Sequence, residues 1–428
     1  MPRLIYTALF YLISPFYFLR LVWKGIENPD YLKRWSERLG FVNITPSGKD
    51  VLWVHAVSVG EVNASLPLLR SLITSYKTLD ILVTTTTPTG SEILMRNMGN
   101  RIKHQYIPID LPYCINKFLK IWNPKALLLL ETEVWPNIIQ ECNRRGIFTA
   151  LVNARLSERS KKNYLKIKSL IVPTIDKIDL LVAQYDSDLK RFKELSKHKK
   201  ISLCGNLKYE VEIPKEMDDI SRNIRENWSI NGEFRPTLIA ASTHEKEEEI
   251  VLTAFSNILK HSENALLILS PRHPERFSKV NSLVIRKGFK VARRSENEDV
   301  SSEINVLLGD TMGELSFLYS VSDVAFVGGS LIDHGGQNLI EPAAMGKPIC
   351  SGSSLRNFEE VASELKQAGA LTVIDGHKGL SLFFLDLLEN KDKLKMAGEA
   401  SKSVFKKNKG VIDKIQLHLS SHFSNIFK

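Results

Sequence analysis

From residue 50 onward, short apolar runs alternate with longer amphipathic segments, and this alternation limits the fold more than any other feature of the chain. Short runs that are apolar throughout are typical of strands buried on both faces. Strands that alternate with helices form parallel sheets with crossover helices, so the pattern predicts an α/β fold. We expect strands at residues 51–57, 81–85, 126–131, 149–152 and 180–183, and again at 237–241, 265–270, 305–308, 324–327 and 348–350.

The expected strands fall into two sets, and a chain of 428 residues is too long for a single core. Residues 211–236 lie between the sets and are polar, with prolines towards both ends. We therefore expect one Rossmann-like domain at residues 25–210, a connection at 211–236 and a second Rossmann-like domain at 237–428. Since ligands bind at the carboxyl ends of parallel strands, we expect a ligand cleft between the two domains.

Residues 328–342 indicate a ligand site in the second domain. They contain two pairs of glycines, follow the apolar strand pattern of residues 323–327 and run into a helix start. Glycines let the backbone approach a phosphate or a ribose, and the helix N-terminus supplies free N–H groups. Glu341 is placed to accept hydrogen bonds from ribose hydroxyls. The alternative is a tight glycine turn that binds nothing.

Four polar segments are expected at strand ends in the first domain and suggest an acceptor site. They contain Ser58, Gly60 and Glu61, then Glu131, then Arg155, and finally Lys208. A carboxylate at the position of Glu61 can act as a general base towards a sugar hydroxyl, although an acidic residue at a helix start also simply favours the helix dipole. Arg155 is a candidate for binding a phosphate.

The second domain offers a cationic candidate and a further strand–turn–helix start. Arg272 follows an expected strand, and its fork fits phosphate oxygens. Residues 310–315 form a turn suited to an anion. His244 is a candidate for contact with the donor substrate. The alternative is a purely structural role for this segment, because Ser242 and Glu245 have the spacing of a capping box.

The N-terminus predicts a membrane anchor at residues 1–24. Residues 4–19 are almost wholly apolar and aromatic, and basic residues flank them on both sides. The run is short for a span, which needs ~20 residues, and it lacks a small-residue cleavage site. An uncleaved anchor, either a short span or a helix in one leaflet, fits these properties. The alternative is a buried first helix of the soluble domain.

The net charge limits the kinds of molecule that the protein is expected to bind. The net charge of +10 suits an anionic membrane surface or a phosphorylated substrate. Nucleic acid is disfavoured, because no basic run is interleaved with aromatic residues.

The four cysteines are scattered and predict buried thiols rather than disulfides or a zinc site. No H-E-x-x-H, Walker A or G-x-S-x-G motif and no metal-binding carboxylate pair is present, so a metal-dependent mechanism is not indicated.

Together these segments resemble the 3-deoxy-D-manno-octulosonic acid (Kdo) transferases of Gram-negative bacteria along nearly the whole chain. Besides the aromatic N-terminus, the resemblance rests on residues 58–61, 131–137, 153–157, 205–208, 271–277, 310–315 and 328–342. Two positions depart from the family. Gln337 stands where the family often has His, and Lys246 stands where it often has Gly. If the family's His contacts the sugar donor, Gln337 must replace its hydrogen bond with that of a neutral amide. The alternative is that the position is peripheral.

The resemblance implies a B-type glycosyltransferase fold and transfer of Kdo from CMP-Kdo to a lipid A precursor (lipid IVA), with inversion and without a metal or cofactor. It implies an enzyme at the cytoplasmic face of the inner membrane. Glu61 would be the general base, assisted by Glu131 and Lys208, while Ser58, Gly60 and Arg155 are candidates for acceptor contacts. The implied CMP-binding residues are Pro271, Arg272, Met312, Gly313, Glu314, Asn338, Leu339, Ile340 and Glu341.

Two other functions fit part of the pattern. A nucleotide-sugar 2-epimerase has the same paired Rossmann architecture, but it has no reason for a lipid anchor. A non-catalytic nucleotide-binding partner on the membrane would not need Glu61 together with the full set of CMP motifs.

Overall fold

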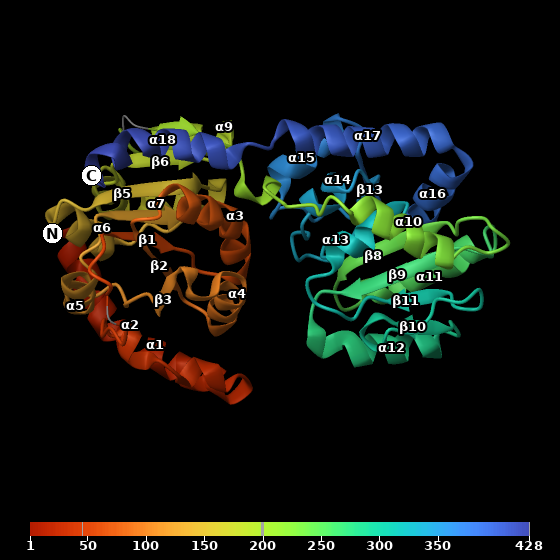
Figure 1. The fold of residues 1–428 in the computed structure, drawn as a ribbon, viewed down its shortest axis with the longest axis horizontal. Coiled ribbons are helices and arrows are strands. Elements are labelled where there is room, and N and C mark those ends of the chain that lie inside the picture. Colours follow the sequence, from red (N-terminus) through yellow and green to blue (C-terminus); the bar gives the residue numbers. More distant parts are fainter. Residues whose placement is uncertain (45, 198–200, 428) are drawn as a thin grey trace. The chain divides into compact units, whose positions relative to one another are not determined.

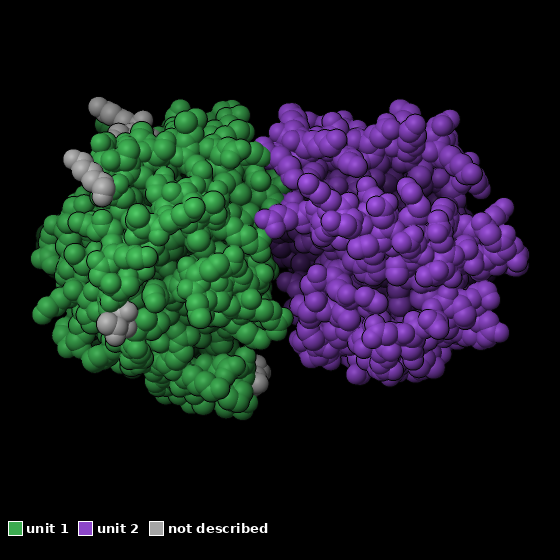
Figure 2. All heavy atoms as spheres, in the orientation of Figure 1, with its two compact units in different colours: residues 1–210, 410–428 green, residues 211–409 purple. Residues whose placement is uncertain are grey.

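The computed structural model describes residues 1–44, 46–197 and 201–427. It divides into one unit of residues 1–210 and 410–428 and a second unit of residues 211–409 (Figure 2). Each unit is built on a seven-stranded sheet of parallel strands (Figure 1). These two sheets confirm the predicted α/β fold with two Rossmann-like domains. All four cysteines are buried and free, as expected.

The sheet of the first unit has the order β3-β2-β1-β4-β5-β6-β7. Its strands are β1 (Val51–His55), β2 (Asp80–Thr85), β3 (Lys103–Tyr106), β4 (Ala126–Leu130), β5 (Phe148–Ala154), β6 (Leu180–Ala183) and β7 (Ile201–Leu203). Successive side chains of a strand point to opposite faces, so Leu52 and Val54 join one core while Val51 and Trp53 join the other. Because both faces are buried, the strands are apolar throughout.

Helices cover both faces of this sheet. Those packed in the core of Leu52 are α3 (Val59–Ser75), α4 (Pro88–Met98) and α18 (Val411–Ile426). Those packed in the core of Trp53 are α5 (Pro112–Trp122), α6 (Pro136–Arg144), α8 (Lys168–Ile175) and α9 (Asp186–Leu195). The unit also contains α1 (Pro2–Glu27), α2 (Trp35–Arg38), α7 (Glu158–Lys166) and the short 3-10 helix η3 (Leu207–Tyr209).

The second unit has the strand order β10-β11-β9-β8-β12-β13-β14. Its strands are β8 (Thr237–Thr243), β9 (Leu266–Pro271), β10 (Val291–Arg293), β11 (Val306–Leu308), β12 (Val324–Val327), β13 (Ile349–Ser351) and β14 (Leu371–Val373). Its helices are α10 (Met217–Asn227), α11 (Glu247–Leu259), α12 (Phe277–Arg286), α13 (Leu315–Ser320), α14 (Ile340–Ala344), α15 (Glu359–Gln367), α16 (Gly376–Glu389) and α17 (Lys391–Lys407). Side chains from α11, α12 and α16 share one core with the sheet, and residues of α13 pack against its other face.

The unit boundaries differ from the sequence-based domains at two places. Helix α18 belongs to the first unit rather than to the expected domain 237–428: Phe423 packs edge-on against Tyr76 and Phe148, and Gln416 donates a hydrogen bond to Ser71. The expected connection at 211–236 is part of the second unit and contains α10, where Arg225 pairs with Asp323 at 2.7 Å.

Helix α1 is the apolar N-terminal helix that the sequence predicts. Residues Pro2–Ile26 are long and apolar enough to cross a membrane, with a mean hydropathy of 1.5. Only 6% of their most apolar window is buried, so the alternative of a buried core helix is wrong. Pro15 lies inside the helix without ending it.

Candidate functional site

The carboxyl ends of the neighbouring strands β1 and β4 hold the acidic candidates of the first unit. After β1, the chain turns into α3, and the Ser58 hydroxyl caps this helix by accepting from the N–H of Glu61. After β4, Glu131 is the first residue beyond the strand and has a φ of 58°, a left-handed conformation that is unusual for a non-glycine residue. Strained backbone of this kind occurs preferentially at functional sites.

Two hydrogen bonds fix the carboxyl of Glu61. Its Oε2 accepts from the backbone N–H of Val57 at 2.7 Å, and its Oε1 accepts from the Ser58 hydroxyl at 3.2 Å. Burial raises the pKa of Glu61 to about 8, and the charges of Glu131 and Glu133 add to this effect although the bond from Val57 opposes it. A raised pKa makes this carboxylate a stronger base once it is ionised.

Glu131 and Lys208 lie together, as their proposed shared role requires. The Lys208 ammonium is 3.7 Å from the Glu131 carboxylate. Lys208 lies in η3, whose start is fixed because Asn206 accepts from the N–H of Lys208 and Asn153 accepts from the N–H of Leu207. The structure therefore brings Glu61, Glu131 and Lys208 to one edge of the sheet.

Glu133 is a member of this acidic cluster that the sequence analysis did not select as a site residue. Its carboxylate accepts from the Trp135 indole N–H at 2.6 Å and lies 3.9 Å from the ring of the fully buried His55. Burial raises the pKa of Glu133 to about 7, and the charge of Glu131 contributes; burial lowers the pKa of His55 to about 4. The repeated glutamates of the Glu131-Thr132-Glu133 segment were the signal that could have revealed it.

The three candidate acceptor contacts lie at the same edge. Ser58 is the cap described above, and Arg155 follows β5, where its carbonyl accepts from the Thr132 hydroxyl at 3.0 Å. Gly60 is exposed in the first turn of α3. A β-carbon added at Gly60 would meet only the Ser58 hydroxyl oxygen, at 3.8 Å. The fold itself therefore does not require a glycine at this position.

In the second unit, the glycine segment begins where β12 ends beside β8. A β-carbon at Gly328 would lie 2.5 Å from the carbonyl oxygen of Ser242, so only glycine allows the two strand ends to approach this closely. Gly329 has a φ of 67°. The glycines of this segment thus have structural reasons as well as the ligand role that the sequence suggests.

The buried Glu247, another residue that the sequence analysis did not select, holds this glycine segment. Its two carboxylate oxygens accept from the backbone N–H groups of His244, Gly329, Ser330 and Leu331 at 2.7–3.0 Å. The alternative capping box of Ser242 and Glu245 does not form. Helix α11 starts after Lys246 without a side-chain cap, the N–H of His244 donates to Glu247, and Glu245 pairs with Lys279. Lys246 has a φ of 77°, a left-handed conformation that glycine adopts more easily than lysine.

Arg272 and Glu341 lie within electrostatic range of each other. Arg272 follows Pro271, the last residue of β9, and its guanidinium is exposed without an ion-pair partner among the described residues. Glu341 lies at the start of α14 and accepts from the Asn338 amide at 2.8 Å, while Asn338 also accepts from the N–H of Ile340. Burial raises the pKa of Glu341, whereas the Asn338 bond and the charge of Arg272 lower it. Leu339 and Ile340 are fully buried and anchor this turn.

In the segment after β11, other side chains engage the carboxylate of Glu314. Glu314 does not present a free carboxylate, since Arg294 donates two hydrogen bonds to it and Thr311 donates a third. The Arg294 contact is the main reason why the pKa of Glu314 is lowered. Met312 is 61% exposed, and Gly313 has a φ of 85° with open space around its α-carbon. The accessible groups here are Met312 and the backbone.

His244 lies among other imidazoles at the end of β8. Its ring stacks on His334 at 4.5 Å and meets His273 edge-on at 5.4 Å, and its Nε2 is 3.0 Å from the Gln337 amide nitrogen. Burial lowers the pKa of His244 to about 4, with neighbouring cationic groups contributing, so its neutral ring can accept from Gln337. Gln337 is therefore a direct neighbour of His244. Across residues 1–44, 46–197 and 201–427, no three His, Cys, Asp or Glu side chains are grouped so that they could hold a metal ion.

The fold of the chain is similar to those of a solved epimerase and a solved glycosyltransferase. A putative UDP-N-acetylglucosamine 2-epimerase from Listeria monocytogenes is 17% identical with a TM-score of 0.59, and the match covers 88% of this chain and 98% of the epimerase. A glycosyltransferase from Rickettsia africae is 15% identical with a TM-score of 0.56, and that match covers 89% and 99%. At such low identity these likenesses show the fold alone, which confirms the predicted B-type glycosyltransferase fold without favouring either activity.

Sequence comparison decides the family. Residues 33–211 match the family model described as 3-deoxy-D-manno-octulosonic-acid transferase (kdotransferase). A 3-deoxy-D-manno-octulosonic acid transferase of Haemophilus influenzae is 38% identical over 418 residues, which cover 97% of each chain. With a relative this similar along nearly its full length, the chain belongs to the Kdo transferase family and is a glycosyltransferase.

Proposed function

We propose that the protein transfers Kdo from CMP-Kdo to a hydroxyl of the lipid A precursor lipid IVA, with inversion at the anomeric carbon and without a metal ion. The observation that carries the proposal is the setting of Glu61. This carboxyl is fixed by Val57 and Ser58 at the rim of the first sheet, and burial raises its pKa. A positioned base with a raised pKa is what activation of a sugar hydroxyl needs.

On the acceptor side, Glu61 takes the hydroxyl proton as the hydroxyl oxygen attacks the anomeric carbon of Kdo. The bond from that carbon to the CMP phosphate oxygen breaks, and CMP leaves with the electron pair. A single displacement from the opposite face inverts the configuration and needs no covalent sugar–enzyme species. Lys208, 3.7 Å from Glu131, supplies positive charge next to the acidic cluster, where it can stabilise the anionic sugar as the bond breaks.

On the donor side, Arg272 binds the CMP phosphate, because its exposed guanidinium has a planar fork that fits phosphate oxygens. Glu341, oriented by Asn338, accepts hydrogen bonds from the ribose hydroxyls. Pro271, Met312, Gly313, Leu339 and Ile340 shape the nucleotide site through their backbone and apolar surface, and Glu314 acts through its ion pair with Arg294.

The proposed place of reaction is the cytoplasmic face of the inner membrane, with α1 as the anchor. Its exposed apolar side chains support this location, among them Leu12 and Phe16, which are 70% and 68% exposed. An acceptor with hydrocarbon chains is itself held in the bilayer, so anchoring brings the enzyme to its substrate.

Mass spectrometry of the lipid formed from CMP-Kdo and lipid IVA tests the proposal. We expect the acceptor mass to rise by one or more Kdo units in the presence of a chelator, with release of CMP. Absence of any Kdo-containing lipid from folded, membrane-bound protein would contradict it. Turnover of a UDP-sugar in place of CMP-Kdo would favour the epimerase alternative.

A further inference from the structure

Side-chain hydrogen bonds tie helix α1 to the first unit at two places. Near its start, the Tyr6 hydroxyl donates to the buried Asp110 at 2.8 Å, and the Thr7 hydroxyl donates to Asn137 at 3.0 Å. Eleven residues later, the Tyr17 hydroxyl accepts from Arg38 at 3.0 Å. At a rise of ~1.5 Å per residue, these contacts extend over roughly 16 Å of helix.

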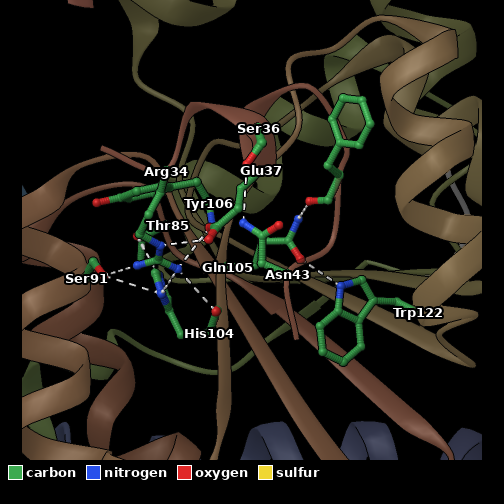
Figure 3. A network of polar contacts seen from close by, with 11 residues as sticks. Arg34, Ser36, Glu37, Asn43, Thr85, Ser91, His104, Gln105, Tyr106 and Trp122 are labelled. Atoms are coloured by element: carbon green, nitrogen blue, oxygen red, sulfur yellow. Dashed lines mark hydrogen bonds and ion pairs between the residues drawn. The ribbon is translucent and has the colours of Figure 1, made fainter. Parts of the chain in front are cut away.

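The segment that follows α1 is tied to the same unit by a buried polar network (Figure 3). The Arg34 guanidinium forms two hydrogen bonds with Glu37 and contacts His104 and Ser91, and Glu37 accepts from the N–H of Tyr106. Arg38 lies over the Tyr106 ring at 4.1 Å and donates to the carbonyl of Thr86 at 2.8 Å. Both ends of the contact between α1 and the unit are therefore fixed.

A pocket lies between α1 and the carboxyl edge of the sheet. Phe10, Ile13 and Tyr17 line it from the helix, and Ile107, Ile109 and Trp135 line it from the loops after β3 and β4. Its volume is about 170 Å³, similar to the ~150 Å³ apolar cavity that stays dry and binds benzene. This space suits a segment of a hydrocarbon chain and is too small for a sugar phosphate head group.

Two residues of the pocket wall connect it to the acidic cluster. Trp135 donates to Glu133 at 2.6 Å. The hydroxyl of Thr86, which also lines the pocket, donates to the carbonyl of Val57, whose own N–H donates to Glu61. The pocket is therefore connected to the proposed base through Thr86 and Val57.

The pocket is also continuous with the exposed apolar surface of α1. Ile13 lines the pocket and is still 54% exposed, and its neighbours Leu12 and Phe16 are 70% and 68% exposed. A chain that leaves a lipid surface at this helix thus meets apolar side chains until it reaches the pocket.

We propose that this pocket binds part of one hydrocarbon chain of the lipid acceptor and thereby brings the acceptor sugar to Glu61. The inference rests on the proposed function, because it takes the acceptor to be a lipid. Each buried methylene group favours binding by roughly fourfold, so even three or four methylenes in the pocket would raise acceptor affinity considerably.

Filling the pocket tests the proposal. Ser14 lines the pocket from α1, and Ser14→Phe should raise KM for detergent-dispersed lipid IVA about tenfold or more while leaving CMP affinity and the rate on O,N-deacylated acceptor unchanged. The matched control is Leu19→Phe, since Leu19 is on the same helix, is 62% exposed and does not line the pocket; it should leave all three values near wild type. Equal losses on both acceptors, or no loss on either, would overturn the proposal.

A labelling experiment gives a readout that needs no turnover and remains informative if a filled variant folds poorly. A lipid IVA analogue with a diazirine in one acyl chain is photolysed with the wild-type protein in detergent. We expect labels in the peptide that contains Ile107 and Ile109, and competition by unlabelled lipid IVA. Labels restricted to the exposed residues of α1 would overturn the proposal. If the pocket is labelled but no Kdo is transferred, the proposed function fails while the chain-binding site stands.

Discussion

At the scale of single residues, the proposed reaction depends on which carboxylate of the acidic cluster accepts the proton of the acceptor hydroxyl. Glu61→Gln keeps the shape of the side chain but cannot accept a proton. Because positioned proton transfer contributes ~10²–10⁴-fold, we expect turnover to fall by about that factor while CMP affinity stays near wild type. Single-turnover kinetics with saturating acceptor measure this loss. If the variant keeps more than about a tenth of the wild-type rate, another residue is the base, and Glu131 is the next to test.

The acidic cluster also sets the pH dependence of the reaction. The pKa of Glu61 is raised to about 8, mainly by burial and in part by the negative charges of Glu131 and Glu133. Since only the ionised carboxylate is a base, kcat/KM should increase with pH through this region. Glu133→Gln removes one like charge, so the pKa of Glu61 should fall and the acid limb should move to lower pH. An acid limb that stays in place in this variant would show that Glu133 does not act on Glu61.

Substitution of Arg272 tests the proposed binding of CMP in the second unit. Arg272→Ala should weaken CMP binding by about 1.5–3 kcal/mol, the range for a hydrogen bond to a charged group. Arg272→Lys should restore only part of the loss, because lysine lacks the bidentate fork. Isothermal titration with CMP measures both, and Arg286→Ala, at an exposed position on α12, is the control. Unchanged affinity in Arg272→Ala would remove this residue from the site.

At the scale of elements, Glu247 connects the start of α11 to the glycine segment after β12. One carboxylate accepts from four backbone N–H groups, three of them in the glycine segment. Glu247→Gln places an amide NH2 against donors, so we expect a loss of roughly 1–3 kcal/mol in the free energy of unfolding and weaker CMP binding. Thermal unfolding and titration measure the two effects. Glu249→Gln, on the exposed side of the same helix, should change neither.

Elements could be predicted from the sequence where their own residues carry the signal. The strands β1, β4, β8, β9 and β12 are buried on both faces, and their apolar runs were predicted. The edge strand β3 was missed because it reads Lys-His-Gln-Tyr. Its polar side chains are buried only because Arg34 meets His104 and Trp122 donates to Gln105, partners that are distant in sequence (Figure 3). The placement of α18 on the first unit depends on Tyr76 and Phe148 in the same way.

The same distinction applies to the candidate site. Glu61, Glu131 and Lys208 follow strand ends, so parallel topology alone brings them to one edge of the sheet. Glu247 could not be predicted, because nothing local marks a carboxylate that accepts from a loop 82 to 84 residues away. The engagement of Glu314 by Arg294 is likewise a tertiary contact.

At the scale of the whole molecule, the proposed membrane anchor α1 is also bound to the fold of the first unit. Its outer side chains are exposed and apolar, whereas Tyr6, Thr7 and Tyr17 bind the unit. Deletion of residues 1–24 should therefore release the protein from membranes, and it should also leave Asp110 without the Tyr6 hydroxyl and Arg38 without Tyr17. We expect CMP binding to persist, because the residues proposed to bind CMP lie in the second unit, and turnover of detergent-dispersed lipid IVA to survive only in part.

The double variant Leu12→Ser/Phe16→Ser separates the two roles of α1. Both side chains are more than two-thirds exposed, so the substitutions reduce the apolar surface that faces a lipid phase without touching the contacts of Tyr6 or Tyr17. This variant should pellet less with anionic lipid vesicles but keep the wild-type unfolding temperature and its turnover in detergent. The deletion variant should lose both vesicle binding and part of its thermal stability. If the double variant also unfolds at a lower temperature, the outer face of α1 is part of the core of the first unit, and the inference that it contacts lipid is wrong. If the deletion variant keeps full stability, the polar contacts at Asp110 and Arg38 contribute nothing to the fold, and α1 is a tether alone.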